Sequence, residues 1–138
     1  MDMALDNNGL PPAPTKYLDY MGFWEGLDED KLNIQKCGQC GTWCHPPQPV
    51  CPDCQTIDRT WAPVSGTGAV YSWVTYNDSV HPGFEAPYTV ALVELDEGVR
   101  LVSRLVDVTP EEVEIGMAVR VSFQKVTDEM ILPFFKKV

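Results

Sequence analysis

The chain has 138 residues, of which 44% are hydrophobic, and this length suits one compact body rather than two full domains. It has no unbroken apolar run of the roughly 18 residues that a membrane span needs, and the N-terminus lacks the basic and apolar regions of a secretory signal, so we expect a cytoplasmic protein with no membrane partner. The formal net charge of −10 is spread along the chain and disfavours nucleic acid as a ligand, because phosphates are bound largely through cations.

Residues 1–15 are rich in proline, asparagine and glycine, which predicts a flexible arm. After Thr15, apolar residues recur at spacings of three and four as far as Leu27, and this pattern predicts an amphipathic helix within residues 16–30. The apolar face of this helix is aromatic and includes Tyr17, Tyr20 and Trp24. Two interpretations of the face remain open, packing on its own domain or contact with a partner chain.

Residues 31–64 contain four cysteines in two Cys-x2-Cys pairs with ten residues between the pairs: Cys37, Cys40, Cys51 and Cys54. Two residues between thiols allow a tight turn that directs both sulfurs at one ion. Four thiolates around Zn²⁺ leave no open coordination position, so the site should be structural. We therefore predict a rubredoxin-like zinc ribbon over residues 31–64 that holds one zinc ion per chain.

The cysteines allow other interpretations. Iron in the same thiolate cage would make an electron carrier, and the sequence alone does not decide between the two metals. A disulfide framework would require an oxidising compartment, which the absence of a signal peptide disfavours. The fifth cysteine, Cys44, is followed by His45, but adjacent residues seldom converge on one reacting atom, so we interpret Cys44 as a buried or incidental thiol.

Residues 65–138 are predicted to be all β. The β-branched and aromatic runs that predict five strands are residues 69–76, 88–95, 99–106, 119–126 and 130–135. A helical turn is expected at Thr109–Pro110–Glu111–Glu112, between the third and fourth strands. This order is that of an OB-fold barrel, although periodicity alone permits another five-stranded barrel. The predicted fold class is therefore mainly β: an N-terminal helix, a zinc ribbon and a five-stranded OB-fold.

The connection between the first two predicted strands, residues 77–87, is the only long loop of the barrel, and long ordered loops on small barrels tend to carry function. His81 in this loop could be a solvated residue, a contact to a ligand or partner, or a general base. Phe84 in the same loop is the apolar side chain that we expect it to present. Phe134 and Phe135, at the end of the last strand, form a further candidate interface.

The whole arrangement resembles a known family. The helix with Phe23-Trp24-Glu25-Gly26, the segments KCGQCG and CPDC, and the runs SGTGAVYSWVTY, HPGF, PYTVALVEL and VRLVSRLV resemble the acyl-CoA-associated zinc-ribbon/OB-fold family, formerly domain of unknown function 35. The resemblance covers about residues 16–138. Its specificity comes from the combination of motifs, because each knuckle or strand alone is a weak signal.

The resemblance implies a non-catalytic accessory subunit of a thiolase-superfamily enzyme, such as a thiolase, an acyltransferase or a steroid side-chain aldolase. The catalytic residues would then belong to the thiolase-like partner, in a hetero-oligomeric complex. This chain would stabilise the partner and help to form its site for the acyl-CoA ester. Among the cations on predicted strands, Arg100, Arg104 and Arg120 could meet the CoA phosphates.

A nucleic-acid-binding OB-fold module is the competing function. Its stacking platform would consist of Tyr71, Trp73 and Tyr76. In a regular strand with a period of two, Tyr71 and Trp73 share a face, whereas Tyr76 lies on the other one.

Overall fold

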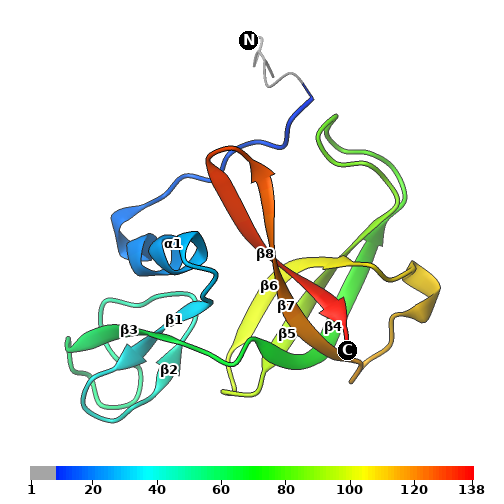
Figure 1. Ribbon diagram of the computed structural model, residues 1–138. Coiled ribbons are helices and arrows are strands. Elements are labelled where there is room, and N and C mark those ends of the chain that lie inside the picture. Colours follow the sequence, from blue (N-terminus) through cyan, green and yellow to red (C-terminus); the bar gives the residue numbers. More distant parts are fainter. Residues whose placement is uncertain (1–8) are drawn as a thin grey trace.

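The computed structural model describes residues 9–138, so residues 1–8 of the predicted arm lie outside the described part. A 3-10 turn, η1 (Leu18–Tyr20), leads into helix α1 (Met21–Asp28), and a three-stranded antiparallel sheet follows, made of β1 (Asn33–Cys37), β2 (Trp43–Cys44) and β3 (Arg59–Pro63). The rest of the chain forms a closed barrel of β4 (Thr67–Tyr76), β5 (Tyr88–Leu95), β6 (Arg100–Val106), β7 (Ala118–Thr127) and β8 (Met130–Lys137), with the 3-10 turn η2 (Pro110–Glu112) before β7 (Figure 1).

The barrel has the strand order β4-β5-β6-β8-β7. Neighbouring strands are antiparallel except β6 and β8, which pair in parallel at Leu105↔Phe135, and β4 pairs with β7 to close the barrel. This order is that of the predicted OB-fold, in which the fifth strand returns beside the third. The mainly-β fold class, with one N-terminal helix and a small cysteine-bearing sheet ahead of the barrel, is therefore confirmed.

Helix α1 starts later than the sequence pattern indicates. Residues 18–20 form a 3-10 turn, and Tyr20 has φ −112° and ψ 6°, outside the α-helical range, so the regular helix begins at Met21. It ends at Asp28, close to the predicted end at Leu27. None of the helices described within residues 9–138 has the length and apolarity that crossing a membrane requires.

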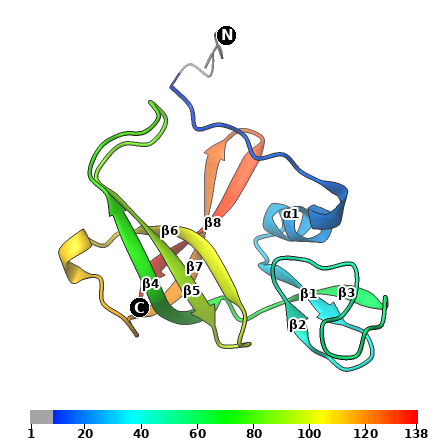
Figure 2. The same ribbon diagram turned by 180° about the vertical axis from the view of Figure 1, so that it is seen from behind.

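Helix α1 joins the small sheet to the barrel, and the two views show it above the small sheet and beside the barrel (Figures 1 and 2). Its Phe23 and Leu27 are buried in a core that continues through Ile34 of the small sheet to Val93 and Phe135 of the barrel. The helix therefore packs within its own chain, as one of the two interpretations proposed.

The core also corrects one predicted contact residue. Phe135 has no exposed surface and points into the barrel, where its strand pairs with both β6 and β7. The neighbouring Phe134 is half-buried and lies on the opposite face of β8, because successive side chains in a strand alternate. Phe135 is thus a core residue, and its prediction as an interface residue was wrong.

A β-bulge corrects the predicted aromatic platform. The pairing of β4 with β5 shifts between Val70 and Ser72, which leaves Tyr71 without a partner on β5. The extra residue changes the alternation, so Tyr71 is exposed whereas Trp73 packs against the core. The expectation that Tyr71 and Trp73 share a face was therefore wrong.

Candidate metal centre and ligand-contact surface

The four cysteines of the two knuckles meet at one point. Their sulfur atoms all lie within 4.8 Å of one another, with Cys37 Sγ 3.5 Å from Cys54 Sγ and Cys40 Sγ 3.6 Å from Cys51 Sγ. A tetrahedral ion with metal–sulfur bonds of about 2.3 Å places its ligands about 3.8 Å apart. The geometry therefore fits one tetrahedral metal ion bound by four thiolates.

The two knuckles have matching backbones. The amide of Gly41 donates to the carbonyl of Cys37 at 3.1 Å, and the amide of Gln55 donates to the carbonyl of Cys51 at 3.0 Å. Gly41 and Gln55 each follow the second cysteine of their pair, and each has a positive φ, of 77° and 61° respectively. A left-handed residue at this point turns the chain back, so that both thiols of a pair face the same ion.

The electrostatics of the cluster favour a bound cation. The backbone amides of Cys40 and Gln39 point at the Cys37 sulfur and hold the pKa of Cys37 below its usual value. The amide of Thr56 acts in the same direction on Cys54, but burial and the sulfurs of the other three cysteines outweigh it and raise the pKa of Cys54 to about 12. Four thiolates this close together repel one another, and a bound divalent cation compensates their charge.

A hydrogen bond between two side chains connects the two knuckles on their exposed side. Thr42 Oγ1 donates to Asp53 Oδ2 at 2.6 Å and accepts from Cys40 Sγ at 3.2 Å. Nothing in the sequence predicts this bridge. Thr42 and Asp53 are eleven residues apart, and no local pattern indicates that their loops meet.

Cys44 lies outside the sulfur cluster. It is buried on β2, and its thiol lies 3.5 Å from the carbonyl oxygen of Pro46. The ring of the adjacent His45 packs 6.1 Å from that of Phe23 in α1, and burial lowers the pKa of His45. His45 therefore packs against the helix, whereas Cys44 is a buried thiol of the small sheet.

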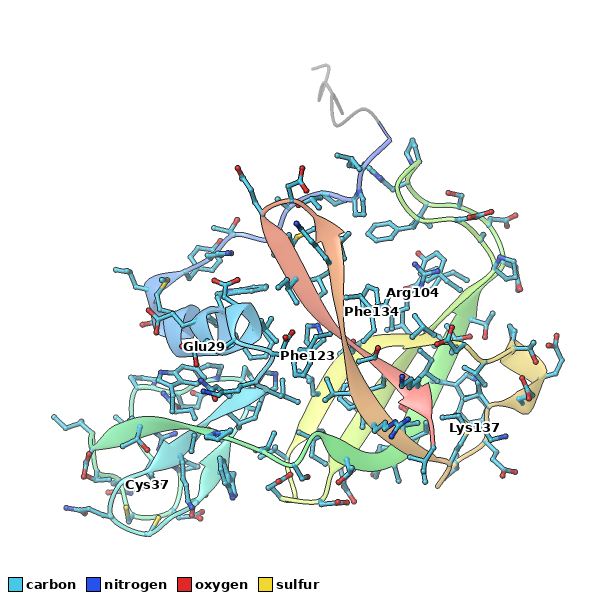
Figure 3. All side chains as sticks on the ribbon, viewed as in Figure 1. Glu29, Cys37, Arg104, Phe123, Phe134 and Lys137 are labelled. Carbon is cyan, nitrogen blue, oxygen red and sulfur yellow. The ribbon has the colours of Figure 1, made fainter. Side chains whose placement is uncertain are left out.

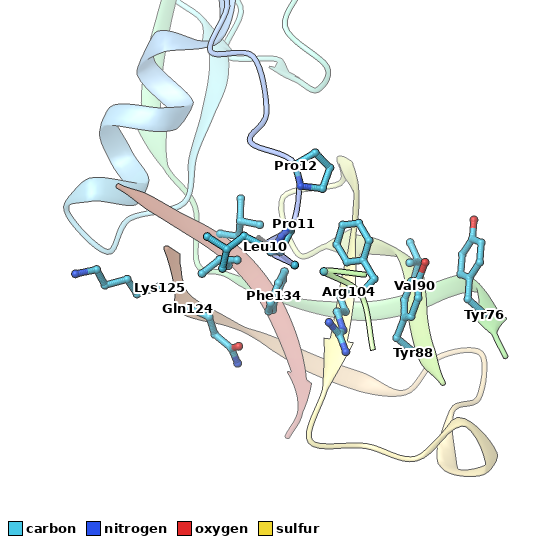
Figure 4. Close-up of a pocket in the computed structure, with 15 residues that line it drawn as sticks. Leu10, Pro11, Pro12, Tyr76, Tyr88, Val90, Arg104, Gln124, Lys125 and Phe134 are labelled. Atoms are coloured by element: carbon cyan, nitrogen blue, oxygen red, sulfur yellow. The ribbon is translucent and has the colours of Figure 1, made fainter. Parts of the chain in front are cut away.

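A pocket of about 610 Å³ lies on the outside of the barrel, between the loop 77–87 and the β7–β8 hairpin (Figure 4). Its wall is largely aromatic and aliphatic, and the side chains used below are Tyr76, Phe84, Tyr88, Val90, Arg104 and Phe134. The structure thus brings together three predicted contact residues that come from a loop and two different strands: Phe84, Arg104 and Phe134. Arg104 and Phe134 lie far from the metal centre, which Cys37 marks in Figure 3.

Arg104 is the cation of this pocket that has no anionic partner among the described residues. Its guanidinium lies 5.3 Å from the centre of the Tyr88 ring, and its buried Nε has no hydrogen-bond partner in the described part of the chain. A half-buried guanidinium beside apolar walls can bind an anion, which would give the Nε–H group the partner that it lacks.

The loop 77–87 has internal hydrogen bonds that hold its shape. The Ser79 hydroxyl oxygen lies 2.8 Å from the carbonyl oxygen of His81 and 2.7 Å from that of Phe84, so its one proton is shared between the two acceptors. The amide of Gly83 donates to His81 Nδ1 at 3.0 Å. The His81 ring lies edge-on to Phe84, with 5.8 Å between ring centres. His81 therefore supports the turn that places Phe84 against Tyr88.

The remaining predicted contact residues do not line this pocket. Tyr17 is 64% exposed, Tyr20 is half-buried, and Trp24 packs against the core beside Phe23. Arg100 donates to Glu94 at 2.9 Å and covers the ring of the bulged Tyr71. The structure thus separates two groups of predicted contact residues that the sequence analysis treated together.

Comparison with known protein families gives two matches along the chain. Residues 24–56 match the rubredoxin-like zinc ribbon domain of ChsH2, and residues 61–124 match the C-terminal OB-fold domain of ChsH2. The first match contains all four clustered cysteines, and the second contains β4, β5 and β6.

Individual relatives extend these matches. The chain is 42% identical over 127 residues to a probable enoyl-CoA hydratase alpha subunit of Thermomonospora curvata; the match covers 92% of this chain but only 40% of that protein's length. It is 38% identical over 100 residues to a DUF35 domain-containing scaffold protein of Methanothermobacter thermautotrophicus, and this match covers 71% of this chain and 75% of the relative.

A solved structure described as an Ltp2-ChsH2(DUF35) aldolase has a chain that superposes on this one with a TM-score of 0.86. The two chains are 42% identical, and the superposition covers 91% of this chain and 98% of the other.

Proposed function

The chain belongs to the ChsH2/DUF35 family, and on this premise we propose that it is a non-catalytic accessory subunit of a thiolase-like, acyl-CoA-processing enzyme. The observation that carries the proposal is the likeness, over nearly the whole chain, to the DUF35 chain of an Ltp2-ChsH2 aldolase. The partner supplies the catalytic residues, and this chain stabilises it. Retro-aldol cleavage of a steroid side-chain acyl-CoA is the specific reaction that we propose.

We propose zinc as the metal of the cysteine cluster. Its ligands are Cys37, Cys40, Cys51 and Cys54, and a tetrahedral cage of four thiolates leaves no position for a substrate. The ion therefore supplies folding energy to the ribbon rather than chemistry. Elemental analysis of protein purified without added metal is the test: one zinc per chain is expected, and iron would contradict the assignment.

The chain's contact with the acyl-CoA ester is proposed at the pocket around Arg104. Phe84, Arg104 and Phe134 surround one space, in which an anionic group can reach the guanidinium while apolar atoms contact the rings. Arg100 suits this role less well, because Glu94 already neutralises it. The two histidines have packing and turn-forming roles, which supports placing the proton-transfer chemistry in the partner.

Nucleic-acid binding is the weaker candidate. The β-bulge separates Tyr71 from Trp73, and the exposed face of Tyr71 is covered by Arg100, so the two rings cannot form one stacking platform. The net charge of −10 also opposes phosphate binding.

Co-expression tests the accessory role. The chain is to be produced together with a thiolase-like protein of the Ltp2 type from the same organism, and separately with an unrelated thiolase as the control. We expect the first pair to elute as one hetero-oligomer on a sizing column and to cleave acyl-CoA substrate, whereas the isolated chain should show no turnover. Two separate peaks at micromolar concentration, or turnover by the isolated chain, would contradict the proposal.

A further inference from the structure

The chain segment before the helix lies across the pocket around Arg104. Residues 9–13, which we call the N-terminal strap, include Leu10, Pro11 and Pro12 in the pocket lining (Figure 4). Leu10 and Pro11 also face the tip of the β7–β8 hairpin, at Thr127–Glu129. In Figure 1 the strap, in dark blue, passes the tip of this hairpin and runs toward the loop 77–87. The strap thus contacts both the loop 77–87 and the tip of the β7–β8 hairpin.

The strap sits directly on a glycine of that loop. A Cβ atom at position 83 would overlap the backbone of Leu10 and Pro11, and Pro11 N most closely. Backbone atoms cannot move aside as a flexible side chain can, so any larger residue at position 83 displaces the strap. Gly83 does not have a positive φ, which makes close packing the structural reason for a glycine here.

We propose that the N-terminal strap is a roof over this pocket, seated by Gly83, and that it holds an anionic ligand with an apolar body against Tyr88, Phe134 and Arg104. A space of about 610 Å³ persists beneath the strap, which is the size of a small-molecule site, so the strap covers the pocket instead of filling it. Proline fixes φ, and Pro11 and Pro12 therefore lower the entropy cost of holding the roof in place.

The class of ligand rests on the proposed function, an acyl thioester or its acid, whereas the roof rests on the structure alone. The apolar walls favour the hydrocarbon part of the ligand, and Arg104 favours its negative end. The strap adds apolar contacts on the side that the barrel leaves open, so its loss should speed ligand release.

The test uses anilinonaphthalene sulfonate, a planar aromatic anion whose fluorescence rises in apolar surroundings, as the probe for the full zinc-bound chain. We expect saturable binding at one site. Arg104→Gln should weaken the affinity about tenfold, because one charge-assisted hydrogen bond is lost. Gly83→Val and deletion of residues 2–13 should each weaken it about fivefold, because the probe loses roughly 40 Å² of apolar contact.

Glu85→Gln is the matched control, since Glu85 is exposed in the same loop and does not line the pocket. This variant should bind the probe with the same affinity as the unaltered chain. If Gly83→Val does not fold, the deletion carries the test. Tighter binding after either change would mean that the strap blocks the site, and would overturn the inference. Absence of saturable binding to the unaltered chain would also overturn it. Neither result changes the co-expression outcome, which tests the accessory role separately.

Discussion

At the residue scale, the metal centre depends on two left-handed residues as much as on its cysteines. Gly41 and Gln55 occupy equivalent positions in the two knuckles, yet only one of them is a glycine. A left-handed residue with a side chain costs roughly 1–2 kcal/mol, so the second knuckle forms against a local strain that the first one avoids. Metal binding offsets this cost, because the ion binds only the folded ribbon.

The first prediction concerns the cysteines. Cys40→Ser should abolish metal binding and unfold the ribbon, because a tetrahedral site that loses one thiolate no longer compensates the others. Cys44→Ser is the matched control and should retain one metal per chain, because Cys44 lies outside the sulfur cluster. Elemental analysis of both purified variants decides the matter. Metal loss in Cys44→Ser would show that the ligand set is wrong.

The second prediction concerns the loop 77–87. Phe84→Ala should lower turnover or partner affinity of the assembled complex at least about fivefold, because a half-buried aromatic side chain of the proposed contact surface is lost. His81→Ala should have a smaller effect, because His81 supports the turn and is assigned no proton transfer. Kinetics of the co-purified complexes provide the measurement, with metal content as the control for folding. Complete loss of turnover in a correctly assembled His81→Ala complex would assign this chain a catalytic role.

At the element scale, helix α1 connects two sheets that share no strand. The Trp61 ring of β3 lies against the backbone of Gly22, and Asn33 Nδ2 donates to the Gly22 carbonyl at 3.1 Å. A glycine in a helix normally costs about 1 kcal/mol relative to alanine. Here the close approach of the indole explains why the helix carries one.

The third prediction follows from this contact. Gly22→Ala should destabilise the protein by about 1–3 kcal/mol despite the better helix propensity of alanine, because the new methyl group would overlap the Trp61 ring. Glu25→Ala, at an exposed position of the same helix, should change stability by less than about 0.5 kcal/mol. Urea unfolding followed by circular dichroism compares the two. A stabilised Gly22→Ala variant would disprove the packing argument.

At the scale of the whole molecule, the ribbon and the barrel share one core. Leu27 of α1, Leu32 before β1 and Ile34 in β1 belong to the same buried cluster as Val119 and Phe135 of the barrel. In Figure 3, Cys37 of the metal centre lies well away from Phe123, which packs against this cluster. Loss of the metal should also destabilise the barrel, because the ribbon contributes residues to the shared core.

The fourth prediction is a single cooperative unfolding transition for the metal-bound chain. Removing the metal with a chelator under reducing conditions should lower the midpoint of barrel unfolding as well as that of the ribbon, because the core would lose its ribbon side. Calorimetry of the two forms measures this, and restoring zinc is the control. An unchanged barrel transition after metal removal would show that the two parts fold independently.

Local patterns were sufficient for much of this protein. The spacing of the four cysteines predicts their cluster, and the five β-branched runs with their turns predict the five strands of the barrel, because these signals come from neighbours in the chain. The strand order followed from the resemblance to an OB-fold, because periodicity alone permits another five-stranded barrel. Gly98, in the turn between β5 and β6, has a φ of 87°, a backbone conformation that glycine adopts readily in a hairpin turn.

Only the tertiary structure decided which side each residue faces and which distant segments meet. The bulge at Tyr71 breaks the strand alternation, and barrel closure turns Phe135 inward; both depend on pairing with strands far along the chain. The pocket around Arg104 depends on such encounters too, because a strap, a loop and a hairpin from separate parts of the sequence form it. Its side chains are unremarkable within their own segments, and they acquire a common role only where the closed barrel brings those segments together.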